Sequence, residues 1–342
     1  MSPEPRRPTV ADARSWVAAD FGVHAVEVEQ VAGGTDTSAV VWRMVDDAGT
    51  AWAAKWTTRP TRTGTRLVAS MAAAGLESTP AAQPTGDGRR RSRRAGGKLA
   101  LTRWSGGEDA ATVGLDLEGW RAYGALLADV HAHVFPPPVR KQGARRGIRR
   151  RRRRYRAEIR ALDAAAAASA VDRDAVLDLW QEARPRIDLL LRGTALVPSS
   201  PAEAVPCHGD PHLGNVLVEA DGALRLVDWD EAVVGPRELD LHLVEFSVLF
   251  DPATPEQLDA FRQGYGPATV DECRMVRFAC VRALEDLTST MTEALATTGE
   301  DRDEALRVFT GILAPTGSAS LVEDRLRRAL AAADEAGRAG QG

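Results

Sequence analysis

An acid, an amide and a second acid lie close together in the stretch from Cys207 to Asp228. Asp210 stands in a short loop, Asn215 follows five residues later where an apolar strand begins, and Asp228 ends a second apolar strand. Magnesium prefers one or two carboxylates plus phosphate oxygens to a site made wholly of protein ligands. The transition state of phosphoryl transfer needs positioning and neutralised charge more than covalent help. Two oxygen ligands flanking one strand pair, with a further carboxylate beside them, meet both needs.

The order and spacing of these residues resemble the catalytic loop of kinases, His-x-Asp-x-x-x-x-Asn. In that loop the Asp accepts the proton of the attacking hydroxyl and the Asn oxygen binds a magnesium ion. The resemblance implies that Asp210 is the catalytic base and that Asn215 and Asp228 hold the metal. The alternative is a plain hairpin of two buried strands, in which the Asp and Asn only form turns. We prefer the catalytic interpretation because three groups stand at the required offsets and Asp221-Gly222 already supplies the hairpin turn.

A strand earlier in the chain could place a cation at this site. In it Trp52, Ala54 and Trp56 share one face, and Lys55 shares the other face with the small Ala53. This resembles the Ala-x-Lys of the third kinase strand, whose lysine pairs with the α- and β-phosphates. A solvent-facing lysine on a half-exposed strand is the alternative, and the downstream loop favours the phosphate role.

A glycine-rich turn, residues 32–38, is expected between strands over residues 25–31 and 39–45. In kinases such a turn lays backbone N–H groups over the ATP phosphates. It does not have the Gly-x-Gly-x-x-Gly form, and a plain hairpin turn explains it equally well. The nucleotide-binding residues expected here are Gly33, Gly34, Thr35 and Ser38.

A further strand runs to Trp104 and into a glycine-containing passage, which predicts a hinge at residues 104–110. We expect the backbone of Thr102 and Trp104 to hydrogen-bond to an adenine edge. The predicted fold class is α+β, a two-lobed protein-kinase-like fold. Its N-lobe, residues 1–103, would be an antiparallel sheet with a helix, and its C-lobe, residues 111–342, mainly helical.

Helical patterns support this division. Residues 9–20 predict a helix with Thr9 as its N-cap, and residues 117–134 predict an amphipathic helix that includes His131, which we expect to pack rather than to bind a metal. Further helices are expected over residues 156–192 (two helices, with a kink at Pro185), from Gly235 through Phe250, and over 271–296, 301–314 and 318–336. The helix expected over residues 65–74 has no acidic residue, whereas its kinase counterpart carries a Glu for the lysine. Either another group orients Lys55, or activity is weaker than the loop suggests, or the register is wrong.

A basic stretch runs from Arg140 to Arg156 and contains an unbroken arginine run, Arg149 to Arg154. A phosphate or RNA patch is one interpretation. Tyr155 is the one aromatic residue next to the run, and the chain has a net charge of −4. We therefore prefer a solvated, partly disordered insertion at about residues 140–156.

The bulk composition is that of an ordinary globular protein, with 342 residues, 44% hydrophobic and 27% charged. Three cysteines without metal or disulfide spacing favour a reducing compartment. Neither the apolar segment of a signal peptide nor an apolar run of the ~18 residues that a spanning helix needs is evident. We expect a cytoplasmic monomer or homodimer with no membrane and no nucleic-acid partner.

The motifs together resemble those of the aminoglycoside phosphotransferase family, over nearly the whole chain. The residues that carry the resemblance, with Lys55, are His208, Gly209, Asp210, Asn215, Asp228, Pro236, Asp240 and Leu241. The segment Val227-Asp-Trp-Asp-Glu231 and the Gly-Pro-Arg-Glu-Leu-Asp-Leu that follows look most like spectinomycin phosphotransferases. The resemblance implies ATP or GTP and Mg²⁺ as cosubstrates, the hydroxyl of a small-molecule antibiotic as acceptor, and a role in resistance.

Acidic residues after the metal Asp agree with a cationic acceptor. Asp230 and Glu231 could hold its amines by charge-assisted hydrogen bonds, although both could also be solvated loop residues. His208 and Asp240 are expected to support the catalytic loop structurally.

Three alternatives stay open. One is a metabolic kinase of the same fold, acting on choline, homoserine or a sugar, because the motifs for ATP and metal are shared. Another is a nucleotide-binding regulator with degenerate catalysis, motivated by the missing helix Glu. The third is an RNA-binding module that uses the arginine run.

Overall fold

The computed structural model describes residues 6–31, 38–59, 62–76, 79–135, 144–168, 175–246 and 252–339. The chain divides into two compact units, which we describe separately. The first comprises Met1–Arg140, Pro206–Val234 and Gln263–Gly266, and the second Lys141–Val205, Gly235–Arg262 and Pro267–Gly342. This division groups the catalytic-loop stretch with the N-terminal sheet. The lobes that we predicted, with a hinge at residues 104–110, stay a prediction.

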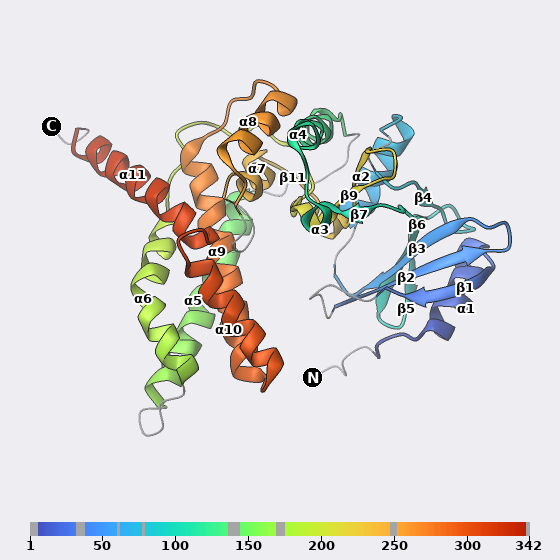
Figure 1. Cartoon of the computed structure of the whole chain (residues 1–342), viewed down its shortest axis with the longest axis horizontal. Helices are drawn as coiled ribbons and strands as arrows, with labels where there is room; N and C mark the ends of the chain where they lie inside the picture. Colours follow the sequence, from blue (N-terminus) through green and yellow to red (C-terminus); the bar gives the residue numbers. More distant parts are fainter. Residues whose placement is uncertain are drawn as a thin grey trace. The chain divides into compact units, whose positions relative to one another are not determined.

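The first unit is built on an antiparallel sheet, as predicted (Figure 1). Its strand order is β1-β2-β3-β6-β4, and β5 also pairs with β6. The strands are β1 (Ala25–Gln30), β2 (Ala39–Asp46), β3 (Ala51–Thr57), β4 (Ala82–Gln83), β5 (Ser92–Arg94) and β6 (Gly97–Arg103). Helix α1 (Val10–Phe21) packs beside β1, and its N-cap Thr9 forms a capping box with Asp12, as the sequence predicted for Thr9.

The alternation predicted for β3 is confirmed. Trp52, Ala54 and Trp56 are buried, and they join a core that includes Trp42 and Leu101 from the neighbouring strands. Lys55 lies on the opposite face of β3, in register with Val41 of β2 and Ala100 of β6. The apolar face therefore fixes which way the lysine points.

The rest of the first unit carries the catalytic stretch. Its elements are α2 (Arg62–Ala73), β7 (Glu108–Asp109), α3 (Ala110–Val113), α4 (Leu117–Ala132), β8 (Val205–Cys207), η1 (Leu213–Asn215), β9 (Val216–Val218), β10 (Leu224–Leu226), η2 (Trp229–Glu231) and β11 (Val233–Gly235). The first residue of β8 and the last residue of β11 belong to the second unit. Strands β9 and β10 form the predicted hairpin, with Gly222 at φ +84° in its turn, and β7 adds a third strand beside β9. The side chains predicted to lie on the buried face of α4, from Trp120 to His131, are buried.

Helix α2 lies against η2. A Cβ atom on Gly64 of α2 would lie 1.9 Å from the carbonyl oxygen of Trp229, so the close approach depends on glycine at this position. The buried side chains of α2, Leu67, Val68 and Met71, are apolar.

The second unit is helical, which agrees with the predicted helical remainder. Its helices are α5 (Ala144–Ala168), α6 (Ala175–Gly193), α7 (Glu238–Glu245), α8 (Pro255–Tyr265), α9 (Glu272–Ala296), α10 (Glu300–Leu313) and α11 (Ser318–Ala339), and the last residues of α8 belong to the first unit. Helix α9 packs against α5, α6, α7, α10 and α11 and forms the centre of this unit. The helix at α8 was not predicted.

The basic stretch differs from our expectation. We predicted a partly disordered insertion at about residues 140–156, but residues 144–168 form the continuous helix α5. Tyr155, Ile159 and Leu162 are buried at helical spacing, which anchors the arginine-rich sequence to the unit. Arg154 is exposed, as expected for a solvated face, and its guanidinium pairs with Glu285 of α9 at 2.8 Å.

Within the described chain, one segment, Glu300–Ala332, is long and apolar enough to cross a membrane by length and composition alone. It is not one helix, because α10 ends at Leu313 and α11 begins at Ser318. Both helices pack on α9 and bury side chains there, Phe309 and Leu326 among them. Core helices of globular proteins pass the same test, so the segment is weak evidence for a membrane.

Candidate active site

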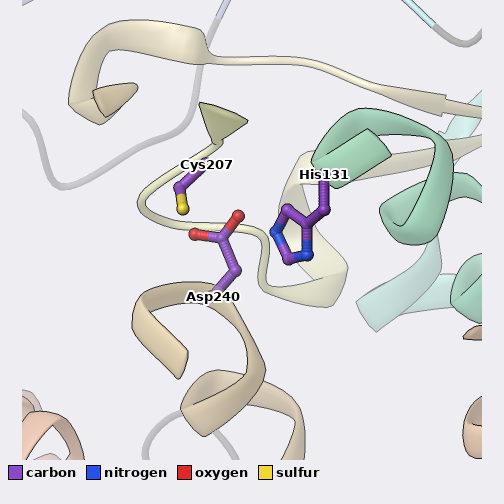
Figure 2. A group of neighbouring side chains, drawn as sticks. All are labelled: His131, Cys207 and Asp240. Carbon is purple, nitrogen blue, oxygen red and sulfur yellow. The ribbon is translucent and has the colours of Figure 1, made fainter. Parts of the chain in front are cut away.

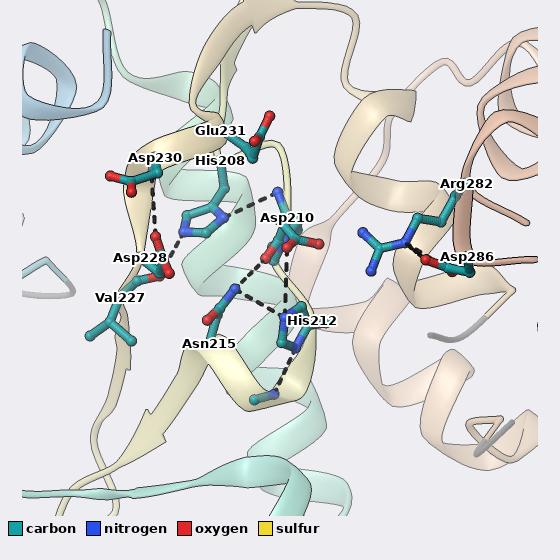
Figure 3. A network of polar contacts seen from close by, with 12 residues as sticks. His208, Asp210, His212, Asn215, Val227, Asp228, Asp230, Glu231, Arg282 and Asp286 are labelled. Atoms are coloured by element: carbon teal, nitrogen blue, oxygen red, sulfur yellow. Dashed lines mark hydrogen bonds and ion pairs between the residues drawn. The ribbon is translucent and has the colours of Figure 1, made fainter. Parts of the chain in front are cut away.

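The catalytic loop is held on both sides of Asp210 (Figure 3). The Asp210 N–H donates to Nδ1 of His208 at 3.3 Å, and Nδ2 of Asn215 donates to the Asp210 carbonyl at 2.8 Å. His208 is fully buried, lies edge-on against Trp229, and bonds through Nε2 to the carbonyl of Val227 at 2.8 Å. Since Nδ1 accepts and Nε2 donates, the ring is the neutral Nε2–H tautomer. His208 thus ties the loop to the end of β10, the geometry that the predicted supporting role requires.

The loop has a further anchor on the side of α4. The hydroxyl of the buried Tyr123 donates to the carbonyl of Pro211, the residue after Asp210. The Asp210 carboxylate is thereby carried on a backbone that is fixed before and after it. A general base needs such fixation, because its reach is the length of a hydrogen bond.

The two predicted metal ligands lie on neighbouring strands. The Val227 N–H donates to the Asn215 carbonyl at 2.9 Å, which ties the residue before Asp228 to Asn215. The amide nitrogen of Asn215 donates to the Asp210 carbonyl and lies 3.2 Å from Nε2 of His212, so the amide oxygen is the atom that Asn215 can offer to a metal. Asp228 is in the left-handed region, with φ +60°, and its side chain is 45% exposed. One amide oxygen and one accessible carboxylate are a donor set that fits Mg²⁺, which takes few protein ligands and completes its shell with phosphate oxygens and water.

Lys55 makes an ion pair with each of two carboxylates. Its Nζ lies 2.6 Å from Oδ1 of Asp228 and 2.9 Å from Oδ2 of Asp230. Burial alone would lower the pKa of Lys55, but the two carboxylates outweigh it and raise that pKa above its usual value. Lys55 is therefore a fixed cation at the site.

The two acids respond differently to the same lysine. Burial favours the neutral form of Asp228, but the charge of Lys55 outweighs burial and holds the pKa of Asp228 below its usual value. Burial raises the pKa of Asp230, Lys55 opposes the rise, and repulsion from Asp228 adds to it, so the net shift is upward. Asp228 is thus the stronger anion of the pair, as a metal ligand should be.

The helix that would carry a lysine partner in kinases does not supply one. Helix α2 has no acidic residue, as the sequence predicted, and the acids beside Lys55 come from the β10–η2 segment instead. Two acids therefore lie beside Lys55, as the first of the open explanations, that another group orients Lys55, requires.

Glu231 pairs with Arg59, a residue that the sequence reasoning missed. The guanidinium of Arg59 lies 3.0 Å from Oε1 of Glu231, and its Nε donates to Oγ of Ser38 at 3.0 Å. The Arg59 carbonyl accepts from Nζ of Lys98 at 2.7 Å. Arg59 thus links the end of the glycine-rich turn to the segment after Asp228. The sequence feature that could have identified Arg59 is its position shortly after the strand that carries Lys55.

His212 is the second residue that the sequence reasoning missed. Its Nδ1 accepts from the Gly214 N–H at 3.1 Å and caps η1, while its Nε2 lies 3.7 Å from Oδ2 of Asp210. Its place between Asp210 and Asn215 could have drawn attention to it. The sequence alone, however, does not tell which way such a ring turns.

The structure describes only some of the other predicted nucleotide-binding residues. Gly33, Gly34 and Thr35 lie outside the described residues. Thr102 pairs with Ala53 on one side and Ala82 on the other. The Trp104 N–H donates to the Ala51 carbonyl at 3.0 Å and so is not the group that would meet an adenine. An adenine contact at Thr102 and Trp104 stays a prediction.

Three side chains of metal-binding types are drawn in Figure 2. His131 and Cys207 belong to the first unit, and Asp240 belongs to α7 of the second. Nδ1 of His131 bonds to the Tyr265 hydroxyl at 2.6 Å, which agrees with the packing role that we expected. Asp240 is fully buried, and its predicted bracing of the catalytic loop stays a prediction.

Comparisons with known proteins agree with this geometry. No curated protein matches the sequence. The fold is similar to that of spectinomycin phosphotransferase APH(9)-Ia in complex with ADP and spectinomycin, with a TM-score of 0.75, 17% identity, and coverage of 94% of this chain and 99% of that one. It is also similar to amicoumacin kinase hAmiN in complex with AMP-PNP, Ca²⁺ and Ami, with a TM-score of 0.57, 16% identity, and coverage of 91% of this chain and 92% of that one.

A choline/ethanolamine kinase family protein from Mesorhizobium loti has a TM-score of 0.51 and 17% identity, with coverage of 92% of this chain and 99% of that one. At these identities the likeness establishes the fold, the two-lobed protein-kinase-like α+β architecture that we predicted. Residues 27–276 match the model of the phosphotransferase enzyme family APH, so the chain belongs to this family of enzymes, which transfer a phosphoryl group to small-molecule hydroxyls.

Proposed function

We propose that the protein uses ATP (or GTP) and Mg²⁺ to phosphorylate a hydroxyl of an aminoglycoside or aminocyclitol antibiotic, with a spectinomycin-like acceptor favoured, and so confers resistance. The observation that supports the proposal is that Lys55, Asp210, Asn215 and Asp228 lie within one unit, where Lys55 pairs with Asp228 and Asn215 bonds to the Asp210 carbonyl. Coulombic and positional help of this kind supplies most of the catalysis in phosphoryl transfer.

The chain's own residues divide the work. Asp210 orients the acceptor hydroxyl and takes its proton, because its backbone is fixed by His208 and Asn215. Asn215 and Asp228 would hold Mg²⁺, and Lys55 would neutralise phosphate charge. The bound nucleotide supplies the γ-phosphoryl group, and the metal supplies charge neutralisation on its oxygens. The turn at residues 33–38 would cover the phosphates.

The choice of acceptor depends on similarity and on one acidic segment. Support comes from the similarity to a spectinomycin phosphotransferase and from the Asp-Trp-Asp-Glu segment. Asp230 and Glu231 each already pair with a cation of this chain, so an acceptor amine would have to displace Lys55 or Arg59. The acceptor-binding role of Glu231 stays a prediction, and a different role for Asp230 is developed below.

A metabolic kinase acting on choline, homoserine or a sugar is the second candidate, supported by the similarity to a choline/ethanolamine kinase family protein. A weakly catalytic regulator is the third, although the carboxylates beside Lys55 answer the observation that motivated it. We propose a cytoplasmic location, where ATP is available, no nucleic-acid partner, and a monomer or homodimer.

The test is nucleotide consumption with Mg²⁺ against a panel of aminoglycosides, spectinomycin, choline, homoserine and sugars, with the Asp210→Asn variant as the matched control. We expect turnover confined to an aminocyclitol or aminoglycoside. In the variant we expect turnover to fall by about 10²–10⁴-fold, the usual worth of general-base help, with nucleotide affinity retained. Turnover on choline or homoserine alone would replace the antibiotic by a metabolite, and wild-type turnover in Asp210→Asn would remove Asp210 from its role.

A further inference from the structure

We propose that Asp230 is the residue that positions Lys55 for the nucleotide phosphates, the task that a helix carboxylate performs in kinases. The proposal rests on the proposed function, because it concerns how the same site is held ready. It assigns to Asp230 a contact inside the protein instead of a contact with the acceptor.

The geometry separates the two acids beside Lys55. Asp228 is the closer, at 2.6 Å, but its side chain is 45% exposed. Asp230 lies 2.9 Å from the same Nζ, and its side chain is only 12% exposed. The open carboxylate is the one that a metal ion can reach, whereas the enclosed one faces the lysine.

The two acids cannot both be committed to Lys55 during the reaction. A carboxylate that ligates Mg²⁺ gives up much of its interaction with a neighbouring ammonium, because the cation takes its charge. Once Asp228 serves the metal, Asp230 is the acid among the described residues that still pairs with Lys55. A lysine side chain has several rotatable bonds and loses its preferred position without such a partner.

The local backbone explains how residues two apart reach the same amine. Asp228 is in the left-handed conformation, and its carboxylate accepts the Asp230 N–H at 3.4 Å as the cap of η2. The short turn brings the Asp230 side chain back beside that of Asp228. Figure 3 shows both side chains on the same segment, with a dashed line between Asp230 and Asp228.

The acid beside Lys55 comes from η2 and not from helix α2. Its buried side chains are apolar, and at Gly64 it approaches the Trp229 carbonyl so closely that no Cβ fits between them. The space next to η2 is thereby taken by helix backbone rather than by a long acidic side chain. In this arrangement η2 supplies, through Asp230, the carboxylate that α2 does not supply.

The first experiment measures how well Lys55 is held, without acceptor or turnover. The chain contains three lysines, Lys55, Lys98 and Lys141, so an amine-acylating reagent followed by peptide mass spectrometry can follow Lys55 separately. The variants are Asp230→Asn and Asp228→Asn, which keep the side-chain shape. Glu219→Gln removes one negative charge from the same unit at a pair with Arg225 and serves as the matched control.

We expect Asp230→Asn to raise the acylation rate of Lys55 several-fold over wild type, and Glu219→Gln to leave it unchanged. The reactions contain Mg²⁺, so that Asp228 is committed to the metal, and under this condition we expect Asp228→Asn to raise the rate less than Asp230→Asn does. The proposal is overturned if Asp230→Asn leaves the rate at the wild-type value, or if Asp228→Asn alone releases the lysine. Because no acceptor is present, a failure of the proposed function leaves this readout intact.

The second measurement separates positioning from acceptor binding. With an acceptor that the enzyme turns over, Asp230→Asn should lower kcat by about 10–100-fold, the cost of a misplaced group, and leave the acceptor KM unchanged. Asp230→Glu, which restores the charge, should recover part of kcat. A rise in acceptor KM with kcat unchanged would assign Asp230 to the acceptor and refute the proposal.

Discussion

Replacing Gly64 by Ala tests whether the contact between α2 and η2 shapes the site. The new Cβ would lie 1.9 Å from the Trp229 oxygen and 2.8 Å from its carbonyl carbon. Ordinary contact begins at 3.4 Å, so one of the two segments must shift by about 1.5 Å. Both partners are backbone, and no flexible side chain can turn away.

Two opposing effects set the size of the change in stability. Ala is favoured over Gly inside a helix by about 1 kcal/mol, and overpacking of this severity costs about 3 kcal/mol, so the free energy of unfolding should fall by about 2 kcal/mol. Because Asp228 and Asp230 flank Trp229, the shift also displaces the acids beside Lys55. A misplacement of about 1 Å costs about 10²-fold in turnover.

The assay combines thermal unfolding with turnover of the acceptor found in the panel. Thr63→Ala, one residue earlier in α2, is the control, because it raises helix propensity without adding volume near η2. Gly64→Ala with the stability and turnover of wild type would show that the two segments separate without cost, and the reasoning from this contact would be wrong.

Two further predictions concern histidines. His212→Ala removes the cap of η1 and should lower the free energy of unfolding by about 1 kcal/mol. His212→Asn keeps an acceptor near the Nδ1 position and should not lower it. Denaturant titrations measure both variants, and equal losses of stability would contradict the capping role. Burial and the nearby Arg282 lower the pKa of His242 from 6.5 to about 4. A folded-state pKa below the unfolded value means that the unfolded chain takes up the proton first, so stability is lost as pH falls from about 6.5 to about 4, by an amount on the order of 3 kcal/mol. His242→Gln should flatten this part of the stability–pH curve, and an unchanged slope would remove His242 as its source.

Local patterns in the sequence predicted the elements that carry the site. The alternation around Lys55 needed only the contrast between two tryptophans and their neighbours, and Asp221-Gly222 was enough for the hairpin. Thr9 capped its helix as expected. In each case the residues that determine the element lie within a few positions of one another, so the sequence pattern alone is enough to predict it.

Two helices had signals that we did not use. Helix α8 begins at Pro255, a favoured first position, after Thr254, which forms a reciprocal pair of bonds with Gln257. In α5 the buried residues Tyr155, Ile159 and Leu162 stand at helical spacing. The arginines around them dominated the composition and suggested disorder, although arginine is a good helix former.

The partners of Lys55 and Glu231 could not be predicted in this way. Lys55 and Asp228 are 173 residues apart, and Arg59 and Glu231 are 172 apart. Motif order implied that Lys55 and Asp228 share a site with a nucleotide. It did not reveal that Asp230 is enclosed and paired with Lys55. That arrangement depends on the left-handed backbone at Asp228 and on the approach of α2 to Trp229.

The discontinuity of the first unit has a consequence for synthesis of the protein. The sheet and its core come from the first hundred or so residues, but the stretch with Asp210, Asn215 and Asp228 begins only at Pro206, and the unit is complete only with Gln263–Gly266. At about 5–20 residues per second, a ribosome adds Asp228 about 9–35 s after Lys55. During that interval the sheet must persist on its own, with the lysine and the inner side of α2 still uncovered. Substitutions in the tryptophan-rich core therefore act on the growing chain from an early stage, and substitutions in the hairpin act only on later folding steps. Yield in the cell and stability of the finished enzyme can then respond to different parts of the same unit.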